Sequence, residues 1–127
     1  MLESKFNSLL RAELRLHHAH VDQIETGLVA RGVPDLHVFS TNKGTYWLEL
    51  KICGNKSKLT VNLSAPQVAW HEDYAKRGGV SWIVVYMPSQ KKLILLKGRD
   101  AFAITQNEAE VVGVFSSFNN LVSHLEN

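Results

Sequence analysis

Two short acidic motifs in apolar surroundings constrain the fold of this chain more than any other feature. Pro34-Asp35 leads into one apolar segment, and Glu49-Leu50-Lys51 ends another. Turn-forming residues fill positions 40–45 between them, a pattern that predicts a β-hairpin. Pairing of its strands would bring Asp35 opposite the Glu49-Lys51 end. Because side chains two apart on a strand share a face, Glu49 and Lys51 would project together.

Two carboxylates and one ammonium on a single patch predict a site for a hard divalent cation such as Mg²⁺, which prefers oxygen ligands. Asp35 could instead hydrogen-bond its own backbone in a turn, and Glu49 could pair with Lys51. A lone carboxylate within an apolar strand is costly to bury, however, and neighbouring same-face charges cannot reach ideal ion-pair geometry. A shared cation therefore explains both acids better.

These residues resemble the signature of the PD-(D/E)XK nuclease superfamily. The longer stretches, Gly32 to Asp35 and Leu63 to Trp70, resemble in particular the phage and virus-type replication-repair nucleases (VRR-NUC), relatives of the Holliday-junction resolvases. The similarity extends from about residue 3 to residue 98. It implies a restriction-endonuclease-like α/β core with a mixed sheet. It also implies a metal-dependent DNA endonuclease, structure-selective on branched DNA such as Holliday junctions or flaps, in phage or viral recombination, repair or replication.

The resemblance also implies roles for individual residues. Asp35 and Glu49 would bind Mg²⁺, for which Mn²⁺ can substitute, together with the backbone carbonyl of Leu50. Lys51 would position the attacking water and stabilise charge on the phosphate, as a compact ammonium can. Gln67, at the start of a helix, would face the metal and the scissile phosphate.

Gln67 has a second interpretation that comes from the residues alone. Ser64-x-x-Gln67 fits a capping box, in which the Gln67 side chain returns to the backbone N–H of Ser64. The two roles are compatible, and both stay open.

A further acidic group is usual in the superfamily, and three residues compete for it. Glu3 and Glu13 fall on the apolar side of the first predicted helix, where a carboxylate needs a partner or a metal. Glu25 ends the predicted strand that precedes the hairpin. We rank Glu25 and Glu3 close together, with Glu13 behind them as a core-facing ion-pair partner.

The histidines give weaker signals. His18 and His20 alternate and could share a face, but two histidines without a third ligand at a recognisable spacing are weak evidence for zinc. A surface or partly buried pair is the better interpretation. His37 and His71 lie near the predicted site in sequence and could contact phosphate, although the sequence favours neither.

Length and composition indicate one soluble globular domain over residues 1–127, with 45% apolar and 20% charged residues. No apolar run approaches the roughly 20 residues of a membrane span. The N-terminus lacks a signal-peptide pattern. The single Cys53 excludes an internal disulfide. We therefore expect a cytoplasmic protein, and the resemblance implies a bacterial or phage-infected cell.

Charge is unevenly distributed along the chain. All 14 Lys and Arg lie in residues 1–99, whereas residues 100–127 hold four acidic residues and neither Lys nor Arg. The excess of basic residues in residues 1–99 suits a phosphate-binding surface, although a solvated surface of mixed charge gives similar counts. Lys56 and Lys58 could contact phosphate or lie in a solvated loop. The resemblance adds a DNA partner and a homodimer, whose two-fold axis would suit a symmetric junction.

Hydrophobic periodicity predicts the order α-β-β-β-α-β-β followed by C-terminal helices. Residues 26–32 are expected to link the first strand to the hairpin, and residues 54–62 form a polar loop. The predicted elements are a helix at 2–16, strands at 19–25, 35–40 and 45–52, a helix at 65–77, strands at 81–86 and 92–96, and helices at 99–105 and 117–125.

Two other functions remain open from the sequence. A non-catalytic binding or inhibitory module could keep the same fold, although the intact Asp35, Glu49 and Lys51 argue against it. A nuclease acting on flaps, nicks or RNA would carry the same motif.

Overall fold

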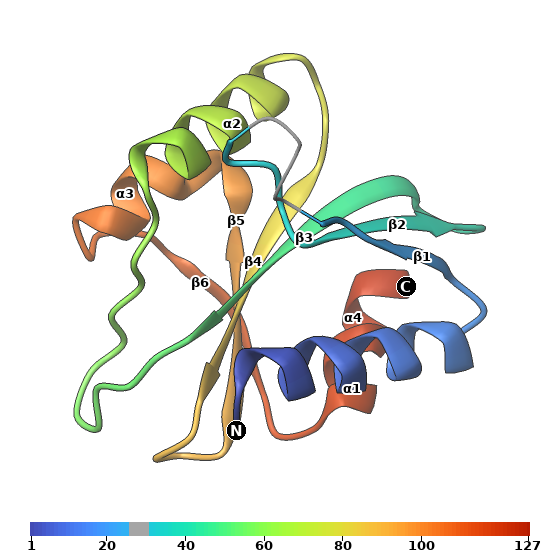
Figure 1. The fold of residues 1–127 in the computed structure, drawn as a ribbon, viewed down its shortest axis with the longest axis horizontal. Helices are drawn as coiled ribbons and strands as arrows, with labels where there is room; N and C mark the ends of the chain where they lie inside the picture. Colours follow the sequence, from blue (N-terminus) through green and yellow to red (C-terminus); the bar gives the residue numbers. More distant parts are fainter. Residues whose placement is uncertain (26–30) are drawn as a thin grey trace.

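The computed structural model describes residues 1–25 and 31–127, which form a six-stranded mixed sheet covered by helices on both faces (Figure 1). Helices α1 and α4 lie on one face, and α2 and α3 lie on the other. In chain order the elements are α1 (Glu3–Leu16), β1 (His20–Gln23), β2 (Leu36–Ser40), β3 (Gly44–Ile52), α2 (Ala65–Lys76), β4 (Ser81–Met87), β5 (Lys92–Lys97), the 3₁₀ turn η1 (Gly98–Asp100), α3 (Ala101–Thr105), β6 (Val111–Phe115) and α4 (Phe118–Glu126).

The strands lie in the sheet in the same order as in the sequence. All neighbours pair antiparallel except β3 and β4, which are parallel. A parallel pair requires a crossover connection, and α2 supplies it. The crossover places α2 directly over the face of β3 that carries Glu49.

Alternation along β3 divides its side chains between two cores. Leu48 and Leu50 join the larger core beneath α1 and α4, with the fully buried Phe6 and Leu10. A smaller core, which includes Ile83 and other apolar residues of β4, β5 and α3, lies on the opposite face. Glu49 and Lys51 alternate with the leucines and face this second side, because successive strand residues point to opposite faces.

The mixed-sheet α/β fold and the hairpin are confirmed, and the predicted elements correspond to observed ones within one or two residues. One prediction was incomplete, because the sequence analysis missed β6. Its residues are exposed or partly buried, and Gly113 interrupts a run of valines, so the segment lacks the apolar–polar alternation of a strand although valine and phenylalanine favour strands. Most of the predicted link at 26–32 lies outside the described residues.

Among the helices that the structure describes, none has both the length and the apolar character to cross a membrane.

Candidate active site

The β2–β3 register explains how Asp35 meets Glu49. Leu36 pairs with Leu48, and continuing this register outward sets Asp35 opposite Glu49 and Pro34 opposite Leu50. Asp35 Oδ2 accepts a hydrogen bond of 2.8 Å from the backbone N–H of Leu50. Proline has no N–H, so Pro34 cannot donate to the Leu50 carbonyl as a paired residue would. The Pro-Asp sequence therefore ends the ladder and leaves a backbone oxygen open beside two carboxylates.

The two carboxyl groups share an environment that opposes ionisation. Burial raises the pKa of Asp35 to about 7, and the negative charge of Glu49 adds to the effect. Burial also raises the pKa of Glu49 to about 7, although a hydrogen bond with Asp35 and the charge of Lys51 act against the rise. Glu49 is only 2% exposed. The two carboxyl groups therefore lie close enough to influence each other's ionisation, as the sequence predicted.

Gln67 joins the helix start to both charged residues of β3. Its Oε1 accepts from the backbone N–H of Ser64 at 2.9 Å and from Nζ of Lys51 at 3.2 Å. Its Nε2 donates to Oε2 of Glu49 at 3.3 Å. Ser64 Oγ in turn accepts from the backbone N–H of Gln67, which completes the capping box. The cap is confirmed, and the same side chain also faces the candidate site.

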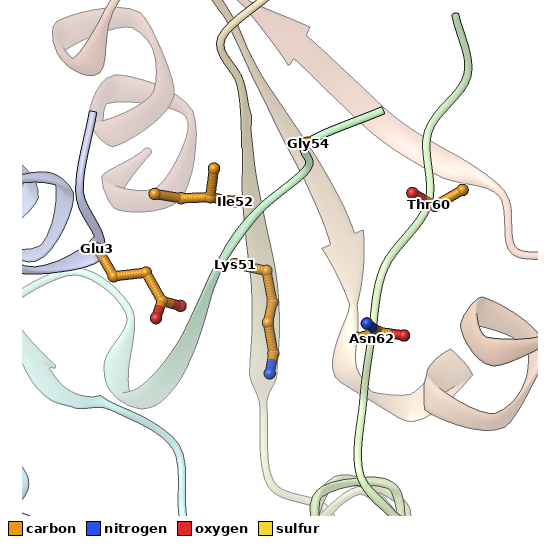
Figure 2. A pocket seen from close by; sticks show the side chains of 6 residues that line it. All are labelled: Glu3, Lys51, Ile52, Gly54, Thr60 and Asn62. Atoms are coloured by element: carbon orange, nitrogen blue, oxygen red, sulfur yellow. The ribbon is translucent and has the colours of Figure 1, made fainter. Parts of the chain in front are cut away.

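Lys51 borders an open cavity of about 410 Å³. Figure 2 shows Glu3 of α1 on one side of this cavity and Thr60 and Asn62 on the other, with the Lys51 side chain extending between them. Such a cavity leaves the ammonium accessible to a ligand that enters from solvent.

A divalent cation fits the donor set at this point. Within residues 1–25 and 31–127, no Lys or Arg lies at salt-bridge distance from Asp35 or Glu49. The two carboxyl groups therefore have no lysine or arginine of the described residues in direct contact, although the charge of Lys51 acts on both. The Leu50 carbonyl adds a third oxygen. The same described ranges contain no group of three or more His, Cys, Asp or Glu residues arranged to hold a metal. The candidate site consequently consists of two carboxylates and a carbonyl.

The three candidates for a further acid lie in different places. Glu3 is exposed at the start of α1 and lines both the cavity beside Lys51 and a smaller one, of about 140 Å³, beside Asp35 and Leu50. Its negative charge also contributes to the raised pKa of Glu49. Glu25 is exposed beyond the end of β1 and lines neither cavity. Glu13 lies 3.4 Å from His17, one helical turn away. Glu3 is therefore the acid with the best access to the site.

Gly32 accounts for the glycine of the Gly-x-Pro-Asp stretch. Its φ is +85°, a conformation that other residues rarely adopt, and a Cβ there would lie 2.2 Å from the Pro66 carbonyl oxygen. Only glycine lets this segment pack against the start of α2, which brings Asp35 and Gln67 into one site.

His71 is the residue whose role the sequence did not reveal. It is fully buried, so it cannot contact a phosphate, and Nε2 lies 3.5 Å from Oε1 of Glu49. Burial lowers the pKa of His71 to about 4. The only sequence signal is its spacing: Gln67 and His71 are four residues apart and share a face of α2.

The remaining histidines lie in other surroundings. His20 is exposed and lies 3.3 Å from Asp22, and the ring of His37 packs against Trp47 with centroids 4.6 Å apart. The described residues give the zinc interpretation no third ligand.

The architecture is a six-stranded mixed sheet with helices on both faces, and the acidic pair lies on the β2–β3 hairpin. The chain superposes on the solved structure of Hjc, a Holliday junction resolvase from the archaeal hyperthermophile Archaeoglobus fulgidus, with a TM-score of 0.63. The match covers 98% of this chain and 99% of that one, at 16% sequence identity. No protein-family model matches the sequence, and no curated protein matches it. The likeness therefore shows the fold.

Proposed function

We propose that this protein is a metal-dependent DNA endonuclease that hydrolyses phosphodiester bonds in branched DNA. One observation carries the proposal: Asp35 and Glu49 meet across the hairpin with raised pKa values and with no lysine or arginine of the described chain at salt-bridge distance. Carboxyl groups that meet in a buried environment with raised pKa values, beside a cavity, are candidates for function rather than stability.

Asp35, Glu49 and the Leu50 carbonyl would hold the cation, with Mg²⁺ as the physiological ion and Mn²⁺ as a substitute. When bound, a divalent cation would supply positive charge that polarises the phosphate and lowers the pKa of water. Lys51 would contact the phosphate or the attacking water from the open cavity. Glu3 is the acid best placed to complete the site.

Gln67 keeps Lys51 and Glu49 in fixed relative positions, because its amide bonds to both. Fixed geometry of this kind lowers the entropic cost of reaching the transition state. We therefore assign a positioning role to the Gln67 side chain, whose amide also caps α2.

Branched DNA is the proposed substrate because the fold matches a Holliday junction resolvase along nearly its whole length. A homodimer would place two sites about a two-fold axis, as a symmetric four-way junction requires. The motif resemblance to phage and virus-type nucleases suggests a role in viral recombination, repair or replication.

Cleavage of labelled DNA tests this function. Four-way junction, flap, linear duplex and single-stranded DNA are incubated with Mg²⁺, Mn²⁺ or EDTA, using wild type, Lys51→Ala and Lys76→Ala. Lys76 is exposed at the far end of α2 and serves as the matched control. We expect wild type and Lys76→Ala to cut the junction in metal only, and Lys51→Ala to lose at least about 100-fold in rate.

Identical products in EDTA and with Lys51→Ala would indicate a contaminating nuclease. Folded wild-type protein that cuts none of the four substrates in either metal would refute the proposed function.

A further inference from the structure

A buried histidine connects Glu49 to the start of β4. Nε2 of His71 lies 3.5 Å from Oε1 of Glu49, and Nδ1 lies 2.7 Å from Oγ of Ser81. In the described part of the chain, Glu49 Oε1 and His71 Nε2 are the buried side-chain polar atoms that lack a hydrogen-bond partner. These two atoms face each other, so a slight approach would satisfy both.

The environment decides which nitrogen holds the proton. A neutral imidazole has one N–H, so only one of the two ring nitrogens of His71 can donate. If that proton were on Nδ1, the Nε2 lone pair would repel Glu49 in its ionised form, which is the form that binds a cation. The Ser81 hydroxyl can donate to Nδ1, which leaves the proton on Nε2, directed at Glu49.

We propose that His71, oriented by Ser81, is a positioning residue that fixes the Glu49 carboxylate for binding a divalent cation, an inference that rests on the function proposed above. Gln67 already donates to Oε2 of Glu49. With His71 donating to Oε1, both oxygens are held, and the carboxylate can turn only by breaking a buried hydrogen bond. Metal-ligating carboxylates are commonly hydrogen-bonded in this way.

The surroundings leave the imidazole and the hydroxyl no room to separate. A Cβ on Gly98 would lie 1.9 Å from Ser81 Oγ and 2.8 Å from His71 Nδ1, so the backbone of η1 packs directly against this contact. The close packing holds Ser81 on Nδ1 and fixes the tautomer.

Mn²⁺ affinity, measured by isothermal titration calorimetry at pH 8, tests the proposal without a cleavage assay. The proteins are wild type, His71→Leu, His71→Gln, Ser81→Ala and Ile104→Ala, each with its unfolding midpoint. We expect His71→Leu to bind about 10–100-fold more weakly and Ser81→Ala several-fold more weakly. His71→Gln should stay within about threefold of wild type, because its amide nitrogen can replace Nε2 as donor.

Ile104→Ala is the control for a purely structural effect. Ile104 is a buried residue of the smaller core and lies outside the candidate site. Truncating its side chain should therefore lower the unfolding midpoint and leave Mn²⁺ affinity unchanged. Wild-type affinity in both Ser81→Ala and folded His71→Leu would overturn the positioning role. If His71→Leu does not fold, Ser81→Ala decides: weaker binding supports the role, and unchanged binding overturns it.

The inference and the proposed function fail in different ways. If the wild type binds Mn²⁺ and cuts junctions and the variants bind Mn²⁺ equally well, only the positioning role of His71 is refuted. If the wild type neither binds Mn²⁺ nor cuts DNA, both the positioning role and the proposed function are refuted.

Discussion

At the scale of single residues, the protein places two carboxyl groups where neither ionises easily. Asp35 and Glu49 both have a pKa raised to about 7, chiefly by burial. Their folded-state pKa values exceed the unfolded ones, so between about pH 4 and pH 7 the folded state retains protons that the unfolded state has lost. Stability contributed by these groups therefore falls as pH rises through that window. The stability contributed by His71 changes in the opposite direction. Because its pKa is lowered in the folded state, this contribution increases as pH rises from about 4 to 6.5.

We expect Asp35→Asn to stabilise the protein at pH 8 in EDTA, on the order of 2 kcal/mol, while abolishing cleavage. Asparagine keeps an oxygen for the Leu50 N–H and removes the repulsion with Glu49. At pH 5, where both carboxyl groups of the wild type are protonated, the gain should disappear. Urea unfolding at the two pH values measures the difference. Equal or lower stability of Asp35→Asn at pH 8 would show that the acid pair is not strained.

At the scale of elements, the start of α2 serves two purposes through one side chain. Ser64 and Gln67 cap the helix reciprocally, and the Gln67 amide also bonds to Glu49 and Lys51. The 3₁₀ turn η1 has a comparable dual position, since Gly98 packs on both Ser81 and His71. Secondary-structure termini here position the site as well as ending helices and strands.

Ser64→Ala and Gln67→Met should separate the cap from the site. Each removes half of the capping box, and each should cost about 1 kcal/mol of stability. Ser64→Ala leaves the Gln67 bonds to Glu49 and Lys51 in place, so its cleavage rate should stay near that of wild type. Gln67→Met should cut junction DNA at least about tenfold more slowly. Equal rates for the two variants would confine Gln67 to a capping role.

Gly98→Ala should destabilise the protein by about 1–3 kcal/mol or more, because the added methyl overlaps Ser81 Oγ. Gly54→Ala is the matched control, since a Cβ at Gly54 meets nothing within 4 Å. Its stability should stay within about 0.5 kcal/mol of wild type. Denaturant midpoints measure both changes. A Gly98→Ala protein as stable as Gly54→Ala would contradict the packing of η1 against Ser81.

At the scale of the whole molecule, charge is segregated along the chain. Every Lys and Arg precedes residue 100. The loop that follows β3 carries the exposed Lys56 and Lys58, and its Gly54, Thr60 and Asn62 line the cavity of Lys51. A basic loop next to a cleft suits contact with a DNA backbone, where each neutralised phosphate releases counterions.

The double variant Lys56→Glu/Lys58→Glu should bind four-way junction DNA more weakly than wild type. Its salt dependence should fall by about 1 in log–log slope for each phosphate that the loop no longer neutralises. Lys76→Glu, at the opposite end of α2, should keep the wild-type slope. Fluorescence anisotropy from 50 to 300 mM salt, roughly the range in which such slopes are measured, with Ca²⁺ in place of Mg²⁺, gives both values. Identical slopes for all three proteins would remove this loop from the DNA interface.

Local sequence determined the parts of the fold that depend on local interactions. Alternation in residues 45–52, the turn residues before them and the Ser64-Gln67 spacing each predicted an element that the structure contains. The pairing of Asp35 with Glu49 could also be predicted, because a hairpin fixes the register of neighbouring strands.

Only the tertiary structure decided the rest. β6 pairs with β5, and its Val112 and Phe115 pack against the larger core, two contacts with segments distant in the sequence. The contact between His71 and Glu49 joins α2 to β3, and the access of Glu3 depends on how α1 crosses the sheet. These contacts join segments that are far apart in the sequence and form only when the chain packs. Short-range periodicity therefore cannot predict them.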